Sequence, residues 1–221
     1  MDGVLYDSLP NHALSWMQIM RSYGFNMTEE DVYLHEGRTG DDTINIISGR
    51  EGKYIGTEER RKIYREKTEI FNTCPTALPM KGSAELLRKT TGYGLFAMLV
   101  TGSGQSTLLD SLNNDFPGIF VRERMVTSFD VKRGKPNPEP YLTALDKGGL
   151  TPDEAIVIEN APLGVEAAQA AGLFTIAVNT GPLPDSILTD AGANFLLPSI
   201  ETLCDEWDHI LDCLNTFRRF I

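Results

Sequence analysis

The chain falls into two parts with different hydrophobic patterns. In residues 10–79, apolar side chains such as Leu14, Met17 and Met20 recur at near-helical spacing, and no segment has the pattern of a strand. Thr28, which three acidic residues follow, marks the start of a second helix, because its hydroxyl can cap the first amides. We therefore predict an all-helical unit over these residues that ends in a proline-containing linker.

The second part alternates short apolar runs with helical segments. We predict strands at 95–100, 155–158, 174–178 and 194–197, with one more strand at either 119–121 or 124–126. Helices are expected near 83–91, 105–113, 138–147, 162–171 and 184–191, and from 199 onwards. Thr151 and Glu154 form a capping box around a one-turn helix. Alternating strands and helices predict an α/β fold with a doubly wound, Rossmann-like parallel sheet.

Composition narrows the class of partner. The 221 residues are 41% hydrophobic, enough for a sizeable core, and carry a formal net charge of −11. This charge argues against nucleic acid or an anionic membrane as the main partner, since both attract basic surfaces. No apolar run approaches the roughly 18 residues of a membrane span. The three cysteines have no metal-like spacing, and their odd number favours reduced thiols. We expect a cytoplasmic monomer.

Four short motifs carry the chemical information. The first is at the start of the chain, two follow predicted strands or their loops, and the last joins a strand to an Ala-rich helix. They are Asp2-Gly3-Val4-Leu5-Tyr6-Asp7-Ser8, Val100-Thr101-Gly102-Ser103, Gly134-Lys135-Pro136-Asn137-Pro138-Glu139 and Ile158-Glu159-Asn160-Ala161-Pro162-Leu163-Gly164. In this order they resemble the motifs of haloacid-dehalogenase-superfamily phosphohydrolases, above all sugar-phosphate phosphatases and β-phosphoglucomutases with a small helical cap.

The resemblance covers essentially the whole chain and divides it. It implies a core from residues 1–9 and 80–221, and a cap from residues 10–79 that chooses the substrate. In the family, an apolar strand runs into Asp-x-Asp-Gly, and the first Asp is the nucleophile. Asp2 and Gly3 match the second Asp and its Gly. We therefore expect the native protein to carry, before Asp2, a central strand that ends in Asp-x.

The resemblance also assigns roles around one point, because the carboxyl ends of parallel strands share an edge of the sheet. Asp2 would be the general acid and base. Thr101, Gly102 and Ser103 would hold the phosphoryl group, and Lys135 would neutralise charge on the nucleophile and the phosphate. A phosphate dianion approaching a carboxylate needs such cations and donors.

Magnesium is the implied cofactor, since Mg²⁺ prefers hard oxygen ligands. The backbone carbonyl of Asp2 and the side chains of Glu159 and Asn160 match the family's metal ligands. Many relatives have Asp where this chain has Asn160. An amide oxygen can still coordinate the ion but adds no charge, so we expect weaker binding than in those relatives.

Substrate choice should depend on residues 36–42, a polar, glycine-rich segment between two predicted helices. Phosphoglucomutases resembling this chain carry an Arg for a second phosphate at the position of Gly40. Its absence favours a phosphatase, with Arg38 as the expected anchor for part of the substrate. His12 matches a mutase histidine in the first cap helix and leaves the mutase alternative open. Ser8 is expected to act mainly as a helix cap.

Three functions therefore compete. The favoured one is a Mg²⁺-dependent phosphatase that acts through an aspartyl-phosphate on a small phosphorylated metabolite, with a sugar phosphate expected. The first alternative is a β-phosphoglucomutase-type isomerase. The second is a non-enzymatic sugar-phosphate-binding protein without a nucleophile, against which the presence of Thr101, Lys135 and Glu159 argues.

Overall fold

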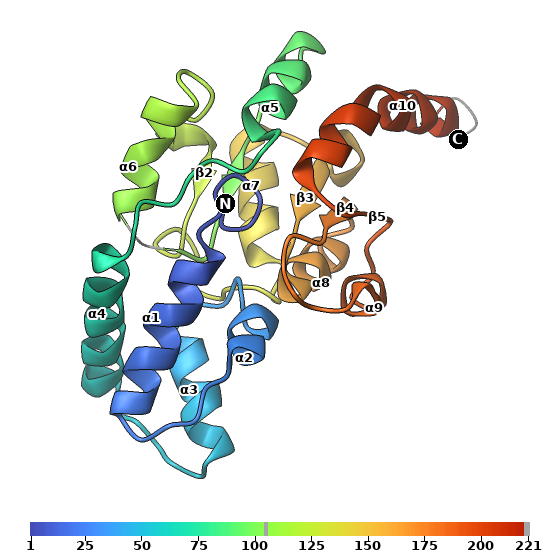
Figure 1. Ribbon diagram of the computed structural model, residues 1–221. Coiled ribbons are helices and arrows are strands. Elements are labelled where there is room, and N and C mark those ends of the chain that lie inside the picture. Colours follow the sequence, from blue (N-terminus) through green and yellow to red (C-terminus); the bar gives the residue numbers. More distant parts are fainter. Residues whose placement is uncertain (104–105, 219–221) are drawn as a thin grey trace.

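The computed structural model describes residues 1–103 and 106–218 (Figure 1). Its helices are α1 (Leu9–Ser22), α2 (Glu29–Leu34), α3 (Gly40–Arg50), α4 (Thr57–Thr73), α5 (Ser83–Gly92), α6 (Ser106–Asp115), α7 (Glu139–Gly148), α8 (Pro162–Ala170), α9 (Asp185–Asp190) and α10 (Ile200–Arg218). Its strands are β1 (Leu99–Val100), β2 (Met125–Val126), β3 (Ile156–Glu159), β4 (Phe174–Val178) and β5 (Phe195–Leu197). Two short 3-10 helices, Arg122–Arg124 and Pro152–Glu154, precede β2 and β3.

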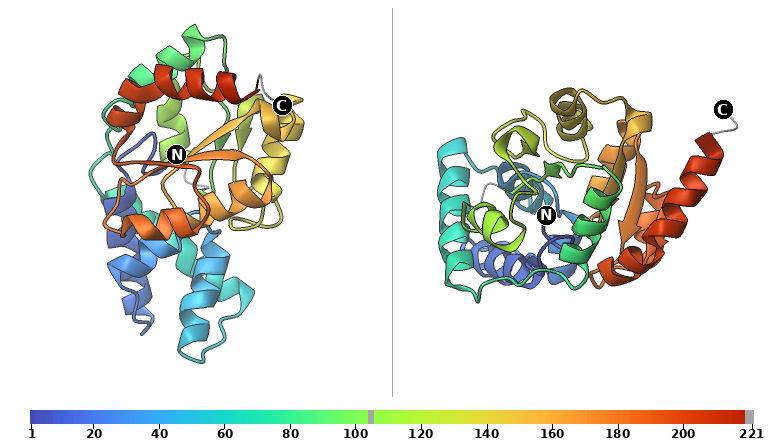
Figure 2. Two further views of the ribbon diagram at one scale, coloured as in Figure 1. Left: turned by 90° about the vertical axis from the view of Figure 1, so that its right-hand side faces the viewer. Right: turned by 90° about the horizontal axis from the view of Figure 1, so that it is seen from above.

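Helices α1 to α4 form a helical unit that projects from the rest of the molecule (Figures 1 and 2). Their apolar faces meet in one cluster, in which Met20, Ile44, Ile47 and Ile63 are fully buried. Thr28 accepts a hydrogen bond from the Asp31 amide, and the Asp31 carboxylate accepts one from the Thr28 amide, which completes a capping box at α2. This unit therefore has a hydrophobic core of its own.

The main sheet consists of β3, β4 and β5 in parallel order. One face packs on α5 and α10, where Ile176 meets Trp207 in a common cluster, and the other packs on α7 and α8, where Val157 meets Tyr141 (Figure 2). Both faces are covered, as expected for parallel strands. The predicted parallel α/β class is confirmed.

Strands β1 and β2 form a second, two-stranded parallel sheet. Within the described residues, no backbone hydrogen bond joins β1 to β3. The N-terminal turn lies between the two sheets, since Val4 packs into the β3–β4 cluster whereas Leu5 and Tyr6 pack with Leu99. The sheet is therefore divided between β1 and β3, and the first residues of the chain lie at this division.

The prediction of a strand over 95–100 was wrong for most of its length. Only Leu99 and Val100 form a strand, and the side chains of Leu95 and Phe96 are 41% and 42% exposed. A strand buried on both faces needs neighbours to cover it, and within the described part of the chain β1 has a strand partner, β2, on one edge only. Of the two candidates for the neighbouring strand, the second was right, because β2 is Met125–Val126.

No helix among the described residues combines the length and the low polarity that a membrane span requires.

Candidate active site

A buried ion pair forms the centre of the candidate site. Lys135, in the loop after β2, donates to Glu159 Oε1 at the end of β3, and its Nζ lies 3.4 Å from the carbonyl oxygen of Val100. Both side chains are buried, as is Thr101 directly after β1. Together with Asp2 and Asn160 they line one hollow, which we call the core hollow. The carboxyl ends of β1 and β3 thus bring the sequence motifs together.

Glu159 is held by four donors. Besides Lys135, the hydroxyl of Tyr141 donates to Oε1 at 2.8 Å, and the amides of Asn160 and Ala161 donate to Oε2 at 3.0 and 3.2 Å. Burial would raise the pKa of Glu159, but the charges of Lys135 and of the N-terminal amino group, together with the hydrogen bonds from Lys135 and Tyr141, outweigh it, so the pKa lies below its ordinary value. Glu159 is therefore a fixed, ionised carboxylate.

Asp2 faces a different set of partners. Its Oδ1 accepts a hydrogen bond from Ser8 Oγ at 2.6 Å and lies 3.3 Å from His12 Nε2. Burial would raise the pKa of Asp2, whereas His12 and the Ser8 hydrogen bond lower it below its ordinary value. The expected role of Ser8 as a helix cap was wrong, because it stands at the cap position of α1 but makes no side-chain cap bond. Its hydroxyl binds Asp2 instead.

A lysine that the sequence did not single out supports His12. Lys67 Nζ, from α4, lies 2.9 Å from His12 Nδ1, and its side chain is 1% exposed. It also lies over the rings of Trp16 and Phe71, at 5.3 and 4.8 Å from their centroids. Because an ammonium group only donates, Nδ1 accepts and Nε2 carries the proton that points to Asp2. Burial lowers the pKa of Lys67 to about 8.

A sequence signal for Lys67 did exist. Ile63, Lys67 and Phe71 recur at intervals of four along α4, and all three are buried. A lysine within an apolar helical stripe has to find partners inside the protein, because a buried charge without them is costly. Tyr141 gave no such signal, since an aromatic residue at a helical spacing is ordinary core.

Segment 36–42 lies directly against the core loops. Glycines make this contact possible: a Cβ on Gly102 would come within 2.6 Å of the Gly37 carbonyl oxygen, and one on Gly134 within 2.9 Å of Thr39 Cγ2. Gly37 itself has φ of +90°, and its backbone lies against the Lys135 side chain. The helical unit therefore closes over the core hollow.

The remaining candidates lie around this contact. Ser103 donates its amide to Thr101 Oγ1 at 3.1 Å, and Arg38 Nε lies 3.4 Å from His35 Nδ1. Arg38, Ser103 and His12 line a second hollow on the side of the helical unit, which we call the cap hollow. Gly102, which lines both, joins the two. All predicted site residues therefore lie along one of two adjoining hollows.

The metal donors are more sparse. The described residues contain no group of three His, Cys, Asp or Glu side chains that could hold an ion. Glu159 and Asn160 follow each other at the end of β3, and the Asn160 side chain packs against Gly3, next to Asp2. A carboxylate, an amide and a backbone carbonyl are hard oxygen donors, and Asp2 lines the same hollow as Glu159 and Asn160, so the residues present fit Mg²⁺ as part of a ligand set.

Comparison with protein families agrees with this geometry. Residues 1–178 match the family described as haloacid dehalogenase-like hydrolase. The chain belongs to the haloacid dehalogenase-like hydrolases. The resemblance read from the four motifs is thus confirmed, and with it membership of a hydrolase family.

Named relatives in this family act on phosphorylated carbohydrates. The chain is 34% identical to hexitol phosphatase A of Escherichia coli over 81% of this chain and 80% of the relative. It is 31% identical to the phosphorylated carbohydrates phosphatase of Thermotoga maritima, over 92% and 94% of the two chains. Beta-phosphoglucomutase of Bacillus subtilis is 24% identical, over 94% and 93%.

Among solved structures, “Putative beta-phosphoglucomutase from Bacteroides vulgatus” superposes with a TM-score of 0.94 at 58% identity. The match covers 97% of this chain and 87% of that chain. The fold of the family is therefore present over nearly the full length.

Proposed function

We propose that this protein is a Mg²⁺-dependent phosphatase that acts through an aspartyl-phosphate on a small phosphorylated metabolite, most directly a sugar phosphate. One observation carries the proposal: the Lys135–Glu159 pair and the hydrogen-bonded Asp2 carboxylate line the same buried hollow. The two phosphatases with more than 30% identity act, by their names, on phosphorylated hexitols and carbohydrates.

Charge neutralisation is the first task of such a site. The Lys135 ammonium would bind a phosphoryl oxygen, and the Thr101 hydroxyl and the Gly102 amide would donate to the others. Magnesium, held by Glu159, Asn160 and the Asp2 carbonyl, would add positive charge at the phosphoryl oxygens. Of these donors, the Gly102 amide is fixed by the backbone, and Lys135 is already held in the hollow by its ion pair with Glu159.

Proton transfer is the second task, and we assign it to Asp2. The Asp2 carboxyl group would be protonated when the phosphoryl group is transferred and would give that proton to the oxygen of the leaving alcohol; the carboxylate that this leaves would then take a proton from the attacking water. The hydrogen bonds from Ser8 and His12 orient it for both steps. Lys67 fixes the tautomer of His12 and so acts on Asp2 indirectly.

We also propose that the nucleophile is an Asp two residues before Asp2, at the end of a strand that pairs with both β1 and β3. The division of the sheet supports this, because among the described residues β1 and β3 each have no strand partner on the edge beside the N-terminal turn. An additional parallel strand would join the two sheets and place its last residues beside Lys135. Residues 10–79 would then be the cap inserted after this strand.

A β-phosphoglucomutase-type activity is the second candidate. It is favoured by His12 next to Asp2 and by the likeness to the Bacteroides vulgatus structure. Against it stands Gly40: any side chain there would overlap the ring of Tyr64. An arginine anchor for a second phosphate therefore has no room at this position unless Tyr64 moves, which favours the phosphatase.

The test uses the protein with its upstream residues. It should release phosphate from sorbitol 6-phosphate in Mg²⁺ and lose this activity in EDTA. Asp2→Asn should lower kcat by about 10²–10⁴-fold, the usual contribution of acid–base assistance. Full activity in EDTA, or an unchanged kcat in Asp2→Asn, would contradict the mechanism.

A further inference from the structure

The cap hollow contains a carboxylate that the proposed chemistry does not use. Glu36 lines the cap hollow and also the core hollow, together with Gly37 and Gly102. A substrate with its phosphate beside Lys135 has to pass this shared wall as it extends into the cap hollow. The part of the substrate next to the phosphate therefore meets Glu36.

The charges around Glu36 decide what it can bind. Burial raises the pKa of Glu36, Asp2 adds negative charge near it, and Lys67 adds positive charge. Lys67 is already committed to His12 Nδ1 and lies between the rings of Trp16 and Phe71. A carboxylate in this position accepts hydrogen bonds from hydroxyl groups, which are neutral donors, but repels a second phosphate.

Two aromatic rings, those of Tyr64 and Trp16, share the cap hollow with Glu36. The ring of Tyr64 packs against Gly40, so closely that no Cβ fits there, and the ring of Trp16 lies 6.1 Å away with an interplanar angle of 43°. Both rings line the cap hollow. Such rings offer apolar surface to the C–H groups of a carbohydrate chain and no charge to a phosphate.

We propose that Glu36 and Tyr64 are specificity-determining residues, which select a phosphate monoester whose other end is an uncharged polyol and exclude a bisphosphate. Glu36 accepts hydrogen bonds from hydroxyls close to the phosphate. Tyr64 packs against the carbon chain and fills the place of an anchor for a second phosphate. This inference rests on the proposed function, since it takes the core hollow as the phosphate site.

The inference is tested by equilibrium binding to the 221-residue chain, which needs no turnover. Isothermal titration calorimetry in Mg²⁺ compares inorganic phosphate, sorbitol 6-phosphate and glucose 1,6-bisphosphate. We expect sorbitol 6-phosphate to bind about tenfold more tightly than either of the other two, a difference of about 1.4 kcal/mol. Inorganic phosphate reports the core hollow alone.

Glu36→Gln keeps the shape of the side chain and removes its charge. It should strengthen binding of the bisphosphate by about tenfold and change the affinity for inorganic phosphate by less than about twofold. Glu30→Gln, an exposed position on α2, is the matched control and should change none of the three affinities. Circular dichroism checks that each variant is folded.

Tyr64→Ala should weaken the binding of sorbitol 6-phosphate by about five- to tenfold. Tyr64→Phe, which keeps the ring, should retain most of the wild-type affinity. The inference is overturned if wild type binds the bisphosphate at least as tightly as the monophosphate, or if Glu36→Gln leaves their ratio unchanged. Should inorganic phosphate itself fail to bind, the core hollow of this chain is not a phosphate site and the inference fails, whereas the proposed function is decided separately by the activity test with the upstream residues present.

Discussion

The two sides of the candidate site differ in how their residues reach it. On the core side, Thr101 directly follows β1 and Glu159 is the last residue of β3, so the topology of the sheet decides where they lie. On the cap side, Glu36 comes from the segment between α2 and α3, whereas Tyr64 and Lys67 come from α4, so they meet only when the helical unit packs. The core side can therefore be read from motifs, and the cap side depends on tertiary packing.

The same contrast applies to charge. On the core side Lys135 is paired with an ionised carboxylate, whereas on the cap side Lys67 faces a histidine and two aromatic rings. The first arrangement suits the binding of a dianion. The second orients one neighbouring group and leaves Lys67 with a lowered pKa. On the function proposed above, the core supplies the chemistry common to all substrates and the cap supplies selection.

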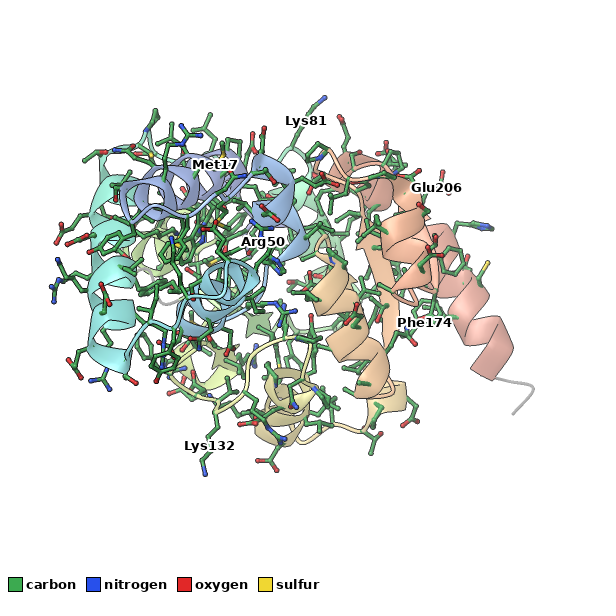
Figure 3. The ribbon with its side chains drawn as sticks, turned by 90° about the horizontal axis from the view of Figure 1, so that it is seen from below. Met17, Arg50, Lys81, Lys132, Phe174 and Glu206 are labelled. Carbon is green, nitrogen blue, oxygen red and sulfur yellow. The ribbon has the colours of Figure 1, made fainter. Side chains whose placement is uncertain are left out.

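The largest effect is expected on the core side. In the protein with its upstream residues, Lys135→Ala should lower kcat by about 10³-fold on sorbitol 6-phosphate and on an aryl phosphate alike, because both need the ammonium at the phosphoryl group. The Lys132 side chain points away from the molecule in Figure 3, so Lys132→Ala is the control and should keep full activity. A loss confined to sorbitol 6-phosphate would place Lys135 on the selective side of the site and break the comparison.

Lys67 allows a test by stability. Its pKa is about 8 in the folded protein and 10.5 ordinarily, so from pH 8 to 10.5 the unfolded chain holds a proton that the folded chain has lost. The cost of burying the charge is full below pH 8 and disappears by pH 10.5, which raises the free energy of unfolding by about 3 kcal/mol over that range.

Urea unfolding of wild type and Lys67→Met across this pH range measures the effect. The variant should lack this rise, whereas Lys62→Met, at an exposed position on the same helix, should retain it. Parallel pH profiles for wild type and Lys67→Met would show that Lys67 keeps an ordinary pKa.

Tyr141 should affect metal binding on the core side. Tyr141→Phe removes the hydroxyl that holds Glu159 Oε1, and the loss of such an outer hydrogen bond weakens metal binding by about tenfold. The Mg²⁺ dependence of the thermal midpoint Tm reports this without turnover. Tyr23→Phe, which loses a hydrogen bond to Glu66 in the helical unit, is the control and should leave the Mg²⁺ dependence unchanged. An unaltered Mg²⁺ dependence of Tm in Tyr141→Phe would mean that Glu159 keeps its orientation without the Tyr141 hydroxyl.

The contact between the two sides should give the smallest effect. Gly134→Ala places a methyl group against Thr39 and moves segment 36–42 by tenths of an ångström, so kcat/KM for sorbitol 6-phosphate should fall by about three- to tenfold. An aryl phosphate, which does not reach the cap hollow, should be affected less. Gly49→Ala, where a Cβ meets nothing within 4 Å, serves as the control.

Local patterns were sufficient for much of the fold. The strand predicted at 174–178 was found as β4, and the capping box at Thr151 was found before β3. In contrast, the apolar run at 95–100 became a strand only at Leu99 and Val100. Apolar composition describes what a segment prefers to bury, but the number of neighbouring strands decides how much of it pairs.

For the site, the motifs predicted the residues of the core hollow, since each lies next to a strand end. They missed Lys67 and Tyr141, and they gave Ser8 the wrong partner. Each of these depends on a contact between residues far apart in the chain or on a choice between two local hydrogen bonds. The tilt and packing of helices decide such contacts, and a single sequence does not state them.

The central claim is that a hydrolytic core acts on a monophosphate whose uncharged end is selected by Glu36 and Tyr64 of the cap hollow. Phosphorus-31 NMR of the protein with its upstream residues tests it most directly, with Mg²⁺ and an equal mixture of sorbitol 6-phosphate and β-glucose 1-phosphate, primed with glucose 1,6-bisphosphate. We predict growth of the inorganic phosphate signal at the expense of sorbitol 6-phosphate. Accumulation of glucose 6-phosphate without inorganic phosphate would contradict the account and establish a mutase.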